Sequence, residues 1–483
     1  MNDSKLSKLS IPQDILQSLF LASNSSTLEI ALERLIQVAR ETNGRTQLAA
    51  KNILTIVLQL CQCVSDPSCR QIRLLSLKLL RNLCAGEIIN QNSFIEQKGV
   101  GIVSSVIISA NRCSSDLEMV RIGLQILGNV SLAGKDHQQA VWHDIFTPDI
   151  VEIAQIRNRG TCDPLCMIFY TCLEGNSGYV SDICSDKGLP VLVEIIRTAS
   201  AVGSGEDWFE LLLSKICLEE SYLSPLFSKL SLCDDTKLKS DVFEPEQAFL
   251  LSSLSKILNE QISDISIFDE FALSVLGIFR KAAGVVRFTS RGNSGLPTGF
   301  PNIDVLGYSL TILRDICACD PNKAKSIDVV ESLLSTGFLE LLLDLLCDLE
   351  PPAIIRKAAR QGTINEGISS DSGKCCPYKG FRRDIVAVVG NCAYRRKPVQ
   401  DWIRENNKLL VLLQQCVTDD DNPFLREWGI WSMRNLLEGN EENQRKVSEL
   451  EVQGSVDMPE LAGLGLRVEV DPKTHCAKLV NVS

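Results

Sequence analysis

Few side chains in this sequence could act as the histidine base of a serine or cysteine nucleophile. The chain contains three histidines, His137, His143 and His475, and a serine or cysteine nucleophile needs such a base beside it. His137 and His143 are six residues apart, so on a helix they lie on different faces. The sequence has no G-x-x-x-x-G-K-[ST] phosphate loop and no G-x-S-x-G nucleophile turn. We therefore predict that the protein is not an enzyme. An enzyme would need a clustered base and nucleophile, and the hypothesis would be revived if His137, His143 and a cysteine met within hydrogen-bond distance in a pocket.

The cysteines offer little metal chemistry. There are 19 of them, but their close groups lack the paired C-x-x-C spacing of a zinc site, and the histidines do not complete one. These groups are Cys61, Cys63 and Cys69; Cys162 and Cys166; Cys317 and Cys319; and Cys375 with Cys376. Others lie in apolar helical segments, where a thiol behaves as a small buried hydrophobe: Cys84, Cys172, Cys217, Cys317, Cys392 and Cys416. We expect no metal and no cofactor.

One short pattern recurs along the chain, an aliphatic helical run that leads to an asparagine. These marker asparagines are Asn82, Asn129, Asn391 and Asn435. A glutamine follows each marker by nine residues and an apolar residue follows it by twelve. Two weaker copies keep the same frame with Thr171 or Asp315 at the marker position. Six copies in one frame indicate an internal repeat.

The spacing of the markers defines the class of repeat. From 82 to 129 is 47 residues, from 129 to 171 is 42, and from 391 to 435 is 44. Armadillo and HEAT units have about 40–47 residues. Within a unit the sequence predicts a helix, a short break and a helix. Because one such unit cannot bury its own apolar face, neighbours must stack. We predict an all-α fold, a right-handed armadillo/HEAT-like α-solenoid with an extended concave surface.

Three segments interrupt the repeat. Residues 284–303 read as a surface loop, and residues 350–379, which are rich in glycine, proline and serine, read as a flexible linker. In the last repeat we expect Asn422 to cap a helix from Phe424 to Leu437, followed by a second helix from about Glu442 to Glu451. The tail alternates apolar and polar residues and could form a small hairpin. The expected organisation is an N-terminal array (1–349), the linker (350–379), C-terminal repeats (380–451) and a non-helical tail (452–483).

The markers are the best candidates for a binding surface. In armadillo repeats the third helix lines the concave groove, and an asparagine there hydrogen-bonds the backbone of a bound extended peptide. Trp431 and Asn435 are four residues apart and share a helix face, which resembles the armadillo Trp-x-x-x-Asn pair. The other repeats have Lys78, Gln125 and Ala387 at the tryptophan position, which argues against a regular peptide ladder. Alternatively, the asparagines satisfy free carbonyls or amides of the adjoining turn.

A run of basic residues near the C-terminus offers a second candidate. It would suit an acidic peptide or a phosphorylated site, although a solvated helix surface is the simpler explanation and the one we favour. The run comprises Lys379, Arg382, Arg383, Arg395, Arg396 and Lys397.

Composition limits the classes of partner and compartment. With 49 basic and 60 acidic residues, the net charge of −11 argues against a general nucleic-acid binder. No run of about 18 apolar residues could span a membrane. Gln17 and Ser18 interrupt the apolar stretch near the N-terminus, so we expect no signal peptide. The prediction is a cytoplasmic protein with reduced thiols.

Two motifs in the C-terminal part carry a family resemblance. They are Gly380-Phe381-Arg382-Arg383-Asp384-Ile385 with Gly390-Asn391-Cys392-Ala393-Tyr394, and Asp420 to Trp428 continuing through Arg434-Asn435-Leu436-Leu437-Glu438. Together they resemble the ataxin-10 domain, over roughly residues 379–475. The resemblance implies a cytoplasmic, non-catalytic armadillo-like protein with a role in cytokinesis, and in animals in neurite growth and neuronal survival. The partners it implies include a G-protein β subunit and the O-GlcNAc transferase.

Taken together, the residues and the resemblance predict a protein-binding scaffold of the ataxin-10 type, acting in cell division or signalling. Its concave surface would hold an extended peptide or a helical segment of another protein. The alternative is an importin-like transport adaptor for basic cargo, which would need a regular Trp/Asn ladder and an acidic groove. The oligomeric state is left open. The predicted partner-binding residues are Trp431, Asn435, Arg434, Asn391, Arg395, Asn129 and Asn82.

Overall fold

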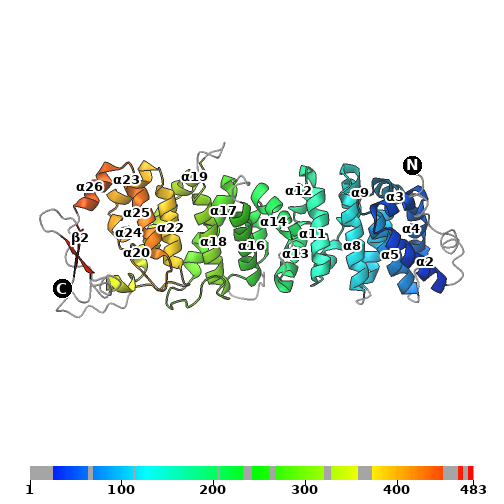
Figure 1. Ribbon diagram of the computed structural model, residues 1–483, viewed down its shortest axis with the longest axis horizontal. Coiled ribbons are helices and arrows are strands. Elements are labelled where there is room, and N and C mark those ends of the chain that lie inside the picture. The colour runs from blue at the N-terminus through cyan, green and yellow to red at the C-terminus, as the bar shows by residue number, and fades with distance from the viewer. Residues whose placement is uncertain are drawn as a thin grey trace. The chain divides into compact units, whose positions relative to one another are not determined.

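The computed structural model describes most of the chain (Figure 1): residues 25–63, 69–112, 116–203, 207–231, 242–261, 267–319, 328–356, 373–449, 466–470 and 477–481. Over these residues every regular element is a helix, except for two short strands near the C-terminus. The predicted all-α class is therefore confirmed. The chain divides into two compact units, residues 1–275 and 276–483.

The first unit shows the repeat in its complete form. Each repeat holds three helices rather than the predicted pair, and the marker lies near the end of the third. Three helices per repeat are typical of armadillo units. The helices of this unit are α2 (Ser25–Val38), α3 (Thr42–Ala50), α4 (Ile53–Cys63), α5 (Arg70–Leu83), α6 (Ile88–Glu96), α7 (Gly99–Arg112), α8 (Leu117–Ser131), α9 (Lys135–Ile145), α10 (Ile150–Ala154), α11 (Arg159–Leu173), α12 (Ser177–Ile183), α13 (Leu189–Val202), α14 (Asp207–Leu213), the π-helix η3 (Ser214–Glu219), α15 (Leu223–Lys229) and α16 (Pro245–Gln261).

The third helices of successive repeats pack on one another. The helix α8 contacts α5 on one side and α11 on the other, and α7 of its own repeat also packs against it. Its apolar residues are accordingly buried nearly all round: Met119, Val120, Ile122, Leu124, Ile126, Leu127 and Val130. A helix that is apolar on all sides must be enclosed by neighbours. The stacking of repeats supplies the core that no single repeat could form.

The second unit repeats this arrangement around three marker helices. Its α22 packs against α18 and α25, so the third helices again form a continuous stack. The boundary between the units falls within α17 (Asp269–Val285). The other helices are α18 (Pro301–Cys317), α19 (Val329–Ser335), α20 (Phe338–Asp348), α22 (Phe381–Ala393), α23 (Lys397–Glu405), α24 (Leu409–Leu413), α25 (Leu425–Leu437) and α26 (Glu441–Ser448).

The expected role of Asn422 is wrong. The residue that precedes α25 is Phe424, whose φ of 65° is left-handed and whose side chain makes no capping bond. The side chain of Asn422 is buried, and its Oδ1 accepts a hydrogen bond from the backbone amide of Arg382, 3.0 Å away. It therefore serves a free amide at the start of α22. Sequence spacing could not show this, because the two residues are 40 positions apart.

The described ends of the predicted linker are packed against the loop between α17 and α18. The amide of Cys375 donates to the carbonyl of Phe288, and that of Lys379 to the carbonyl of Ser294, both at 2.8 Å. Tyr378 is fully buried. The middle of the linker, residues 357–372, lies outside the described residues. The predicted division of the chain at 350–379 thus stays a prediction.

The tail carries the hairpin that its alternation suggested. Strand β1 (Leu466–Val470) pairs antiparallel with β2 (Ala477–Asn481), with Val468 opposite Leu479. Within the described part of the chain, no helix has both the length and the apolar character to cross a bilayer.

Candidate partner-binding site

A hollow of about 330 Å³ lies in the second unit, where three repeats end side by side. Its wall comes from the last turn of α18, the last turn of α22 with the bend that follows it, and the C-terminal half of α25. Helices α18, α22 and α25 stack in that order, so the hollow opens on successive repeats. The lining residues are Cys317, Ala318, Cys319, Asn391, Tyr394, Arg395, Arg396, Trp431, Arg434, Asn435 and Glu438. We call it the marker hollow.

Five of the seven predicted partner-binding residues meet in this hollow. They are Trp431, Asn435, Arg434, Asn391 and Arg395. Asn82 and Asn129 lie in the first unit, at the same position of their own repeats. The sequence prediction missed the other lining residues, although their distances from the markers could have indicated them: Tyr394 and Glu438 each follow a marker by three residues.

The marker asparagines share one structural role. The Nδ2 of Asn435 donates to the carbonyl of Gly390 at 3.0 Å, and that of Asn129 to the carbonyl of Arg81 at 3.1 Å. Asn391 bonds the carbonyl of Arg314 at 3.3 Å, and Asn82 that of Ile36 at 3.4 Å. In each case the amide reaches a carbonyl in the last turn of the preceding third helix, a region where carbonyls commonly lack helical partners. The Arg314 carbonyl also accepts from the backbone amide of Ala318 at 3.1 Å.

Two of the glutamines that follow a marker by nine residues add to this link. The Nε2 of Gln91 donates to the carbonyl of Cys84, just after the preceding third helix, at 3.0 Å, and to that of Asn129 in its own repeat at 2.8 Å. Gln400 bridges the carbonyls of Ala393 and Asn435 in the same way, at 3.2 and 2.8 Å. The Nδ2 atoms are engaged within the protein, as the alternative explanation requires, and a partner contact of the marker side chains stays a prediction.

Trp431 and Asn435 differ sharply in exposure. The tryptophan is 48% exposed, while Asn435 is only 2% exposed. The guanidinium carbon of Arg434 lies 5.0 Å from the centre of the Trp431 ring, a cation–π contact. Of the predicted Trp/Asn pair, the tryptophan face is the part that a partner can reach.

This difference predicts opposite consequences for two alanine substitutions. Asn435→Ala leaves the buried Gly390 carbonyl without a donor and should lower local stability by about 1–3 kcal/mol. Trp431→Ala removes an exposed side chain and should change stability by about 0.5 kcal/mol or less. Limited proteolysis of the full chain, with cleavage within α25 followed by mass spectrometry, measures this. Asn435→Ala should speed that cleavage about fivefold or more, and equal rates for the two variants would contradict the assignment.

The basic run does not form one positive face. Arg382 is buried and donates to Gln415 Oε1 at 3.2 Å and to the carbonyl of Glu350. Arg383 pairs with Asp384 at 2.7 Å, and Lys397 with Asp401 at 3.3 Å. Arg396 makes a forked contact with Asp328, with a shortest distance of 2.9 Å.

Arg395 stands apart from its neighbours in this run. Its guanidinium carbon lies 5.0 Å from the centre of the Tyr394 ring, and the residue is exposed. Its φ is 53°, in the left-handed region. At the matching position after α11 and α25 the chain has glycine, Gly175 and Gly439, with φ of 74° and 67°. The left-handed conformation is less favourable for arginine than for glycine, because the arginine Cβ crowds the following carbonyl oxygen.

Two buried thiols lie near the hollow. The sulfurs of Cys317 and Cys392 are 3.7 Å apart. The hydrogen bond shared with Cys392, together with burial, raises the pKa of Cys317 well above its usual value, so this thiol stays protonated near neutral pH. Thiols of this kind are packing groups rather than nucleophiles.

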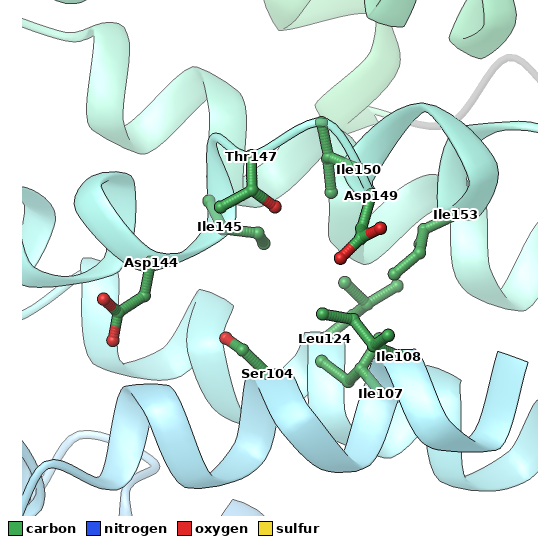
Figure 2. Close-up of a pocket in the computed structure, with 10 residues that line it drawn as sticks. All are labelled: Ser104, Ile107, Ile108, Leu124, Asp144, Ile145, Thr147, Asp149, Ile150 and Ile153. Carbon is green, nitrogen blue, oxygen red and sulfur yellow. The ribbon is translucent and has the colours of Figure 1, made fainter. Parts of the chain in front are cut away.

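The first unit has a crevice of a different kind (Figure 2). Side chains of α7, α8 and α10 and of the α9–α10 segment face one another there, with Ile107, Leu124 and Ile153 among them. Its volume is about 20 Å³, close to the minimum for one water molecule. It is a packing defect between helices and too small for a ligand.

The described residues do not assemble the catalytic group that an enzyme would need. His137 is buried and its Nε2 has no hydrogen-bond partner, whereas His143 on the same helix is exposed. Burial lowers the pKa of His137, which keeps it neutral at neutral pH. Within the same described ranges, no set of three or more His, Cys, Asp or Glu side chains could hold a metal ion.

The fold and the hollow define the class: an armadillo-type repeat protein with a surface hollow at the ends of its third helices. Comparison with known proteins is consistent with this class. Residues 381–478 match the family described as the spinocerebellar ataxia type 10 protein domain. The chain is 25% identical to ataxin-10 of Xenopus tropicalis over 469 residues, which cover 90% of this chain and 89% of that protein. It is 39% identical to the ataxin-10 homolog of Dictyostelium discoideum over 92 residues, 19% of this chain and 15% of that one.

Residues 381–478 match the ataxin-10 domain, as the C-terminal motifs indicated, and similarity to ataxin-10 proteins extends over most of the chain. Among solved structures, it is similar to a designed armadillo repeat protein in complex with the peptide (KR)4, at 14% identity and a TM-score of 0.32, covering 50% of this chain and 98% of that one.

Proposed function

We propose that this chain is a non-catalytic scaffold that binds another protein through the marker hollow. The observation that carries the proposal is an exposed Trp431 in a hollow that gathers five predicted residues from consecutive repeats. Tryptophan and arginine are the side chains most enriched at the energetic centres of protein interfaces. The bound element is an extended peptide or a helical segment whose apolar side chain packs on the Trp431 ring.

A capture experiment tests this proposal. Full-length protein with Trp431→Ala is compared with the wild type and with Ile430→Ala in affinity purification followed by mass spectrometry. Ile430 precedes Trp431 on α25, is 52% exposed, and does not line the hollow, so it controls for loss of exposed apolar surface.

We expect the Trp431 variant to lose a defined set of partners that the Ile430 variant keeps. Truncation of a central interface tryptophan typically costs about 2 kcal/mol or more, a loss of about thirtyfold in affinity. Retention of all partners by Trp431→Ala, or loss of the same partners by both variants, would refute binding in the hollow.

A role in cytokinesis or signalling, in the cytoplasm, is part of the same proposal and has the support of the family resemblance. Depletion of the protein followed by rescue with wild type or Trp431→Ala would test it. If the hollow serves cell division, the wild type should restore normal division and the tryptophan variant should not.

The alternative, a transport adaptor for basic cargo, has less support in the residues of the hollow. Arg395 and Arg434 would repel a lysine-rich peptide, and a regular Trp/Asn ladder is missing at positions 78, 125 and 387. A fluorescent octapeptide of alternating lysine and arginine provides the direct check. Saturable binding that weakens in Trp431→Ala would favour the adaptor.

A further inference from the structure

Two arginines of the marker hollow differ from the others around it. Arg314 pairs with Asp315 and Asp384, and Arg396 pairs with Asp328. Neither Arg395 nor Arg434 has an ion pair with any carboxylate in the described part of the chain. Both are exposed and both line the hollow. They are therefore the cations that remain available to a ligand.

Each of these arginines lies over an aromatic ring. Arg434 contacts Trp431 and Arg395 contacts Tyr394, both with 5.0 Å between the guanidinium carbon and the ring centre. The flat face of the guanidinium group contacts the ring, and the N–H groups along its edge can donate hydrogen bonds to a ligand. Two prepared donor edges thus come from consecutive repeats into one hollow.

The size and the charge of the hollow limit what can bind there. A volume of about 330 Å³ is at the lower end of the range for ligand pockets, about 300–1,000 Å³, and suits a single large side chain. Glu438 is the carboxylate among the lining residues, so the available charge around the hollow is positive. Nucleic acid is not the expected ligand, because it requires an extended basic surface. This chain has a net charge of −11, and the described residues of the hollow offer only two available arginines.

We propose that the marker hollow recognises a phosphorylated side chain on an extended segment of a partner protein, with Arg395 and Arg434 as the phosphate-binding residues. This inference rests on the proposed scaffold function. A phosphoryl group presents three acceptor oxygens and can accept from two guanidinium groups at once. A single guanidinium group can donate two parallel hydrogen bonds to a carboxylate. A glutamate or an aspartate would therefore engage only one of the two arginines. The ring of Trp431 would flank the bound side chain.

Three matched peptide libraries test the proposal on the full-length protein. Each is a degenerate, fluorescently labelled nonapeptide pool whose central residue is phosphoserine, serine or glutamate. Fluorescence anisotropy at constant salt gives the apparent affinity for each pool. We expect the phosphoserine pool to bind at least about tenfold more tightly than the serine pool, and the glutamate pool to lie between them. Equal binding of the three pools would overturn the proposal.

Variants assign the phosphate contact to named residues. Arg395→Gln and Arg434→Gln should each lower affinity for the phosphoserine pool by about tenfold. Arg426→Gln is the matched control, because Arg426 is also an exposed arginine of α25 but does not line the hollow; it should leave the affinity unchanged. Glu438→Gln removes the opposing charge and should tighten binding severalfold. An equal loss in Arg426→Gln would show general charge attraction and would refute the site.

The outcome separates this inference from the scaffold function. Partner proteins captured by the wild type are released from Trp431→Ala if the scaffold proposal holds, whatever their modification. Treatment of these partners with phosphatase before capture should abolish binding if the inference holds. Partners could instead require Trp431 yet still bind after phosphatase treatment and still bind the Arg395→Gln/Arg434→Gln double variant. Such partners would support the scaffold function and refute phosphate recognition.

Discussion

Replacing Asp384 with alanine is expected to destabilise the C-terminal unit by about 3–5 kcal/mol, the cost of breaking a buried charge network by removing one partner. Asp384 is 2% exposed. One of its oxygens accepts from the hydroxyl of Tyr378 at 2.9 Å, and the other from Arg383 at 2.7 Å and Arg314 at 3.4 Å.

The cost arises from what the substitution leaves behind. Tyr378 is fully buried, and burial raises the pKa of its phenol well above the usual value, so the hydroxyl stays protonated and needs an acceptor. Without Asp384 that hydroxyl is unsatisfied in a low-dielectric interior. Arg314 loses one of its two carboxylate partners, and with it a link between α18 and α22.

Hydrogen exchange of the full chain, read from peptides of α18 and α22, measures this effect. We expect Asp384→Ala to lower protection there by about two to three and a half orders of magnitude, which corresponds to about 3–5 kcal/mol. Asp344→Ala is the matched control, since Asp344 is exposed and pairs with Lys408 at 3.4 Å; an exposed pair contributes at most about 1 kcal/mol.

A second variant separates the unpaired hydroxyl from the lost charge. Adding Tyr378→Phe to Asp384→Ala removes the unsatisfied hydroxyl and should recover part of the lost protection. If Asp384→Ala changed protection no more than Asp344→Ala does, the network would not be a stabilising element of this unit.

The second large effect that we expect is a loss of stability when Gly390 is replaced by alanine. An added methyl group would lie 2.3 Å from the Oγ of Ser432 and 3.0 Å from its Cα, so α22 and α25 would have to separate. Overpacking of this kind typically costs about 1–3 kcal/mol. It should outweigh the advantage of alanine over glycine in a helix, about 1 kcal/mol.

Gly277→Ala is the control, and we expect it to change stability in the opposite direction. It lies inside α17, is exposed, and has no atom within 4 Å of the added methyl position. Gly277→Ala should therefore stabilise its helix by about 0.5–1 kcal/mol. Hydrogen exchange should show faster exchange in α22 and α25 for Gly390→Ala and slower exchange in α17 for Gly277→Ala. Slower exchange of α22 and α25 in Gly390→Ala would contradict the close approach of these helices.

The Gly390 substitution also bears on the candidate site. The Gly390 carbonyl bonds α22, which carries Asn391 and is followed by Arg395, to α25, which carries Trp431 and Arg434, so the close approach of these helices holds the two arginines in one hollow. A stability defect in Gly390→Ala is therefore expected to weaken partner binding without any change in a lining side chain.

Much of the fold was predictable because it depends on local and periodic properties. The spacing of the markers reports the length of a repeat, and leucine, isoleucine and valine at helical spacing require a neighbouring surface. The hollow was partly predictable for the same reason, since residues at one position of successive repeats must lie side by side. Trp431 and Asn435 were placed together by their spacing of four on one helix.

Other features depend on residues that are far apart in the chain. The middle helix of the repeats was missed, and at α10 and α24 it has only five residues, too short a pattern to recognise. Asn422 was assigned to the helix that follows it, whereas its side chain serves Arg382. A capping residue and a residue that bonds a distant helix look alike in sequence.

The sequence by itself determined the repeat class, the positions of the markers and the family resemblance, since each depends on the order and spacing of residues along the chain. Only the tertiary structure decided what each polar side chain does. In the folded chain the amide of Asn435 bonds the Gly390 carbonyl, whereas Trp431 stays exposed. Arg396 pairs with Asp328, whereas Arg395 and Arg434 line the hollow without an ion pair to a described carboxylate. Hydrogen bonds and ion pairs depend on distances of a few ångströms between groups that the chain brings together only by folding.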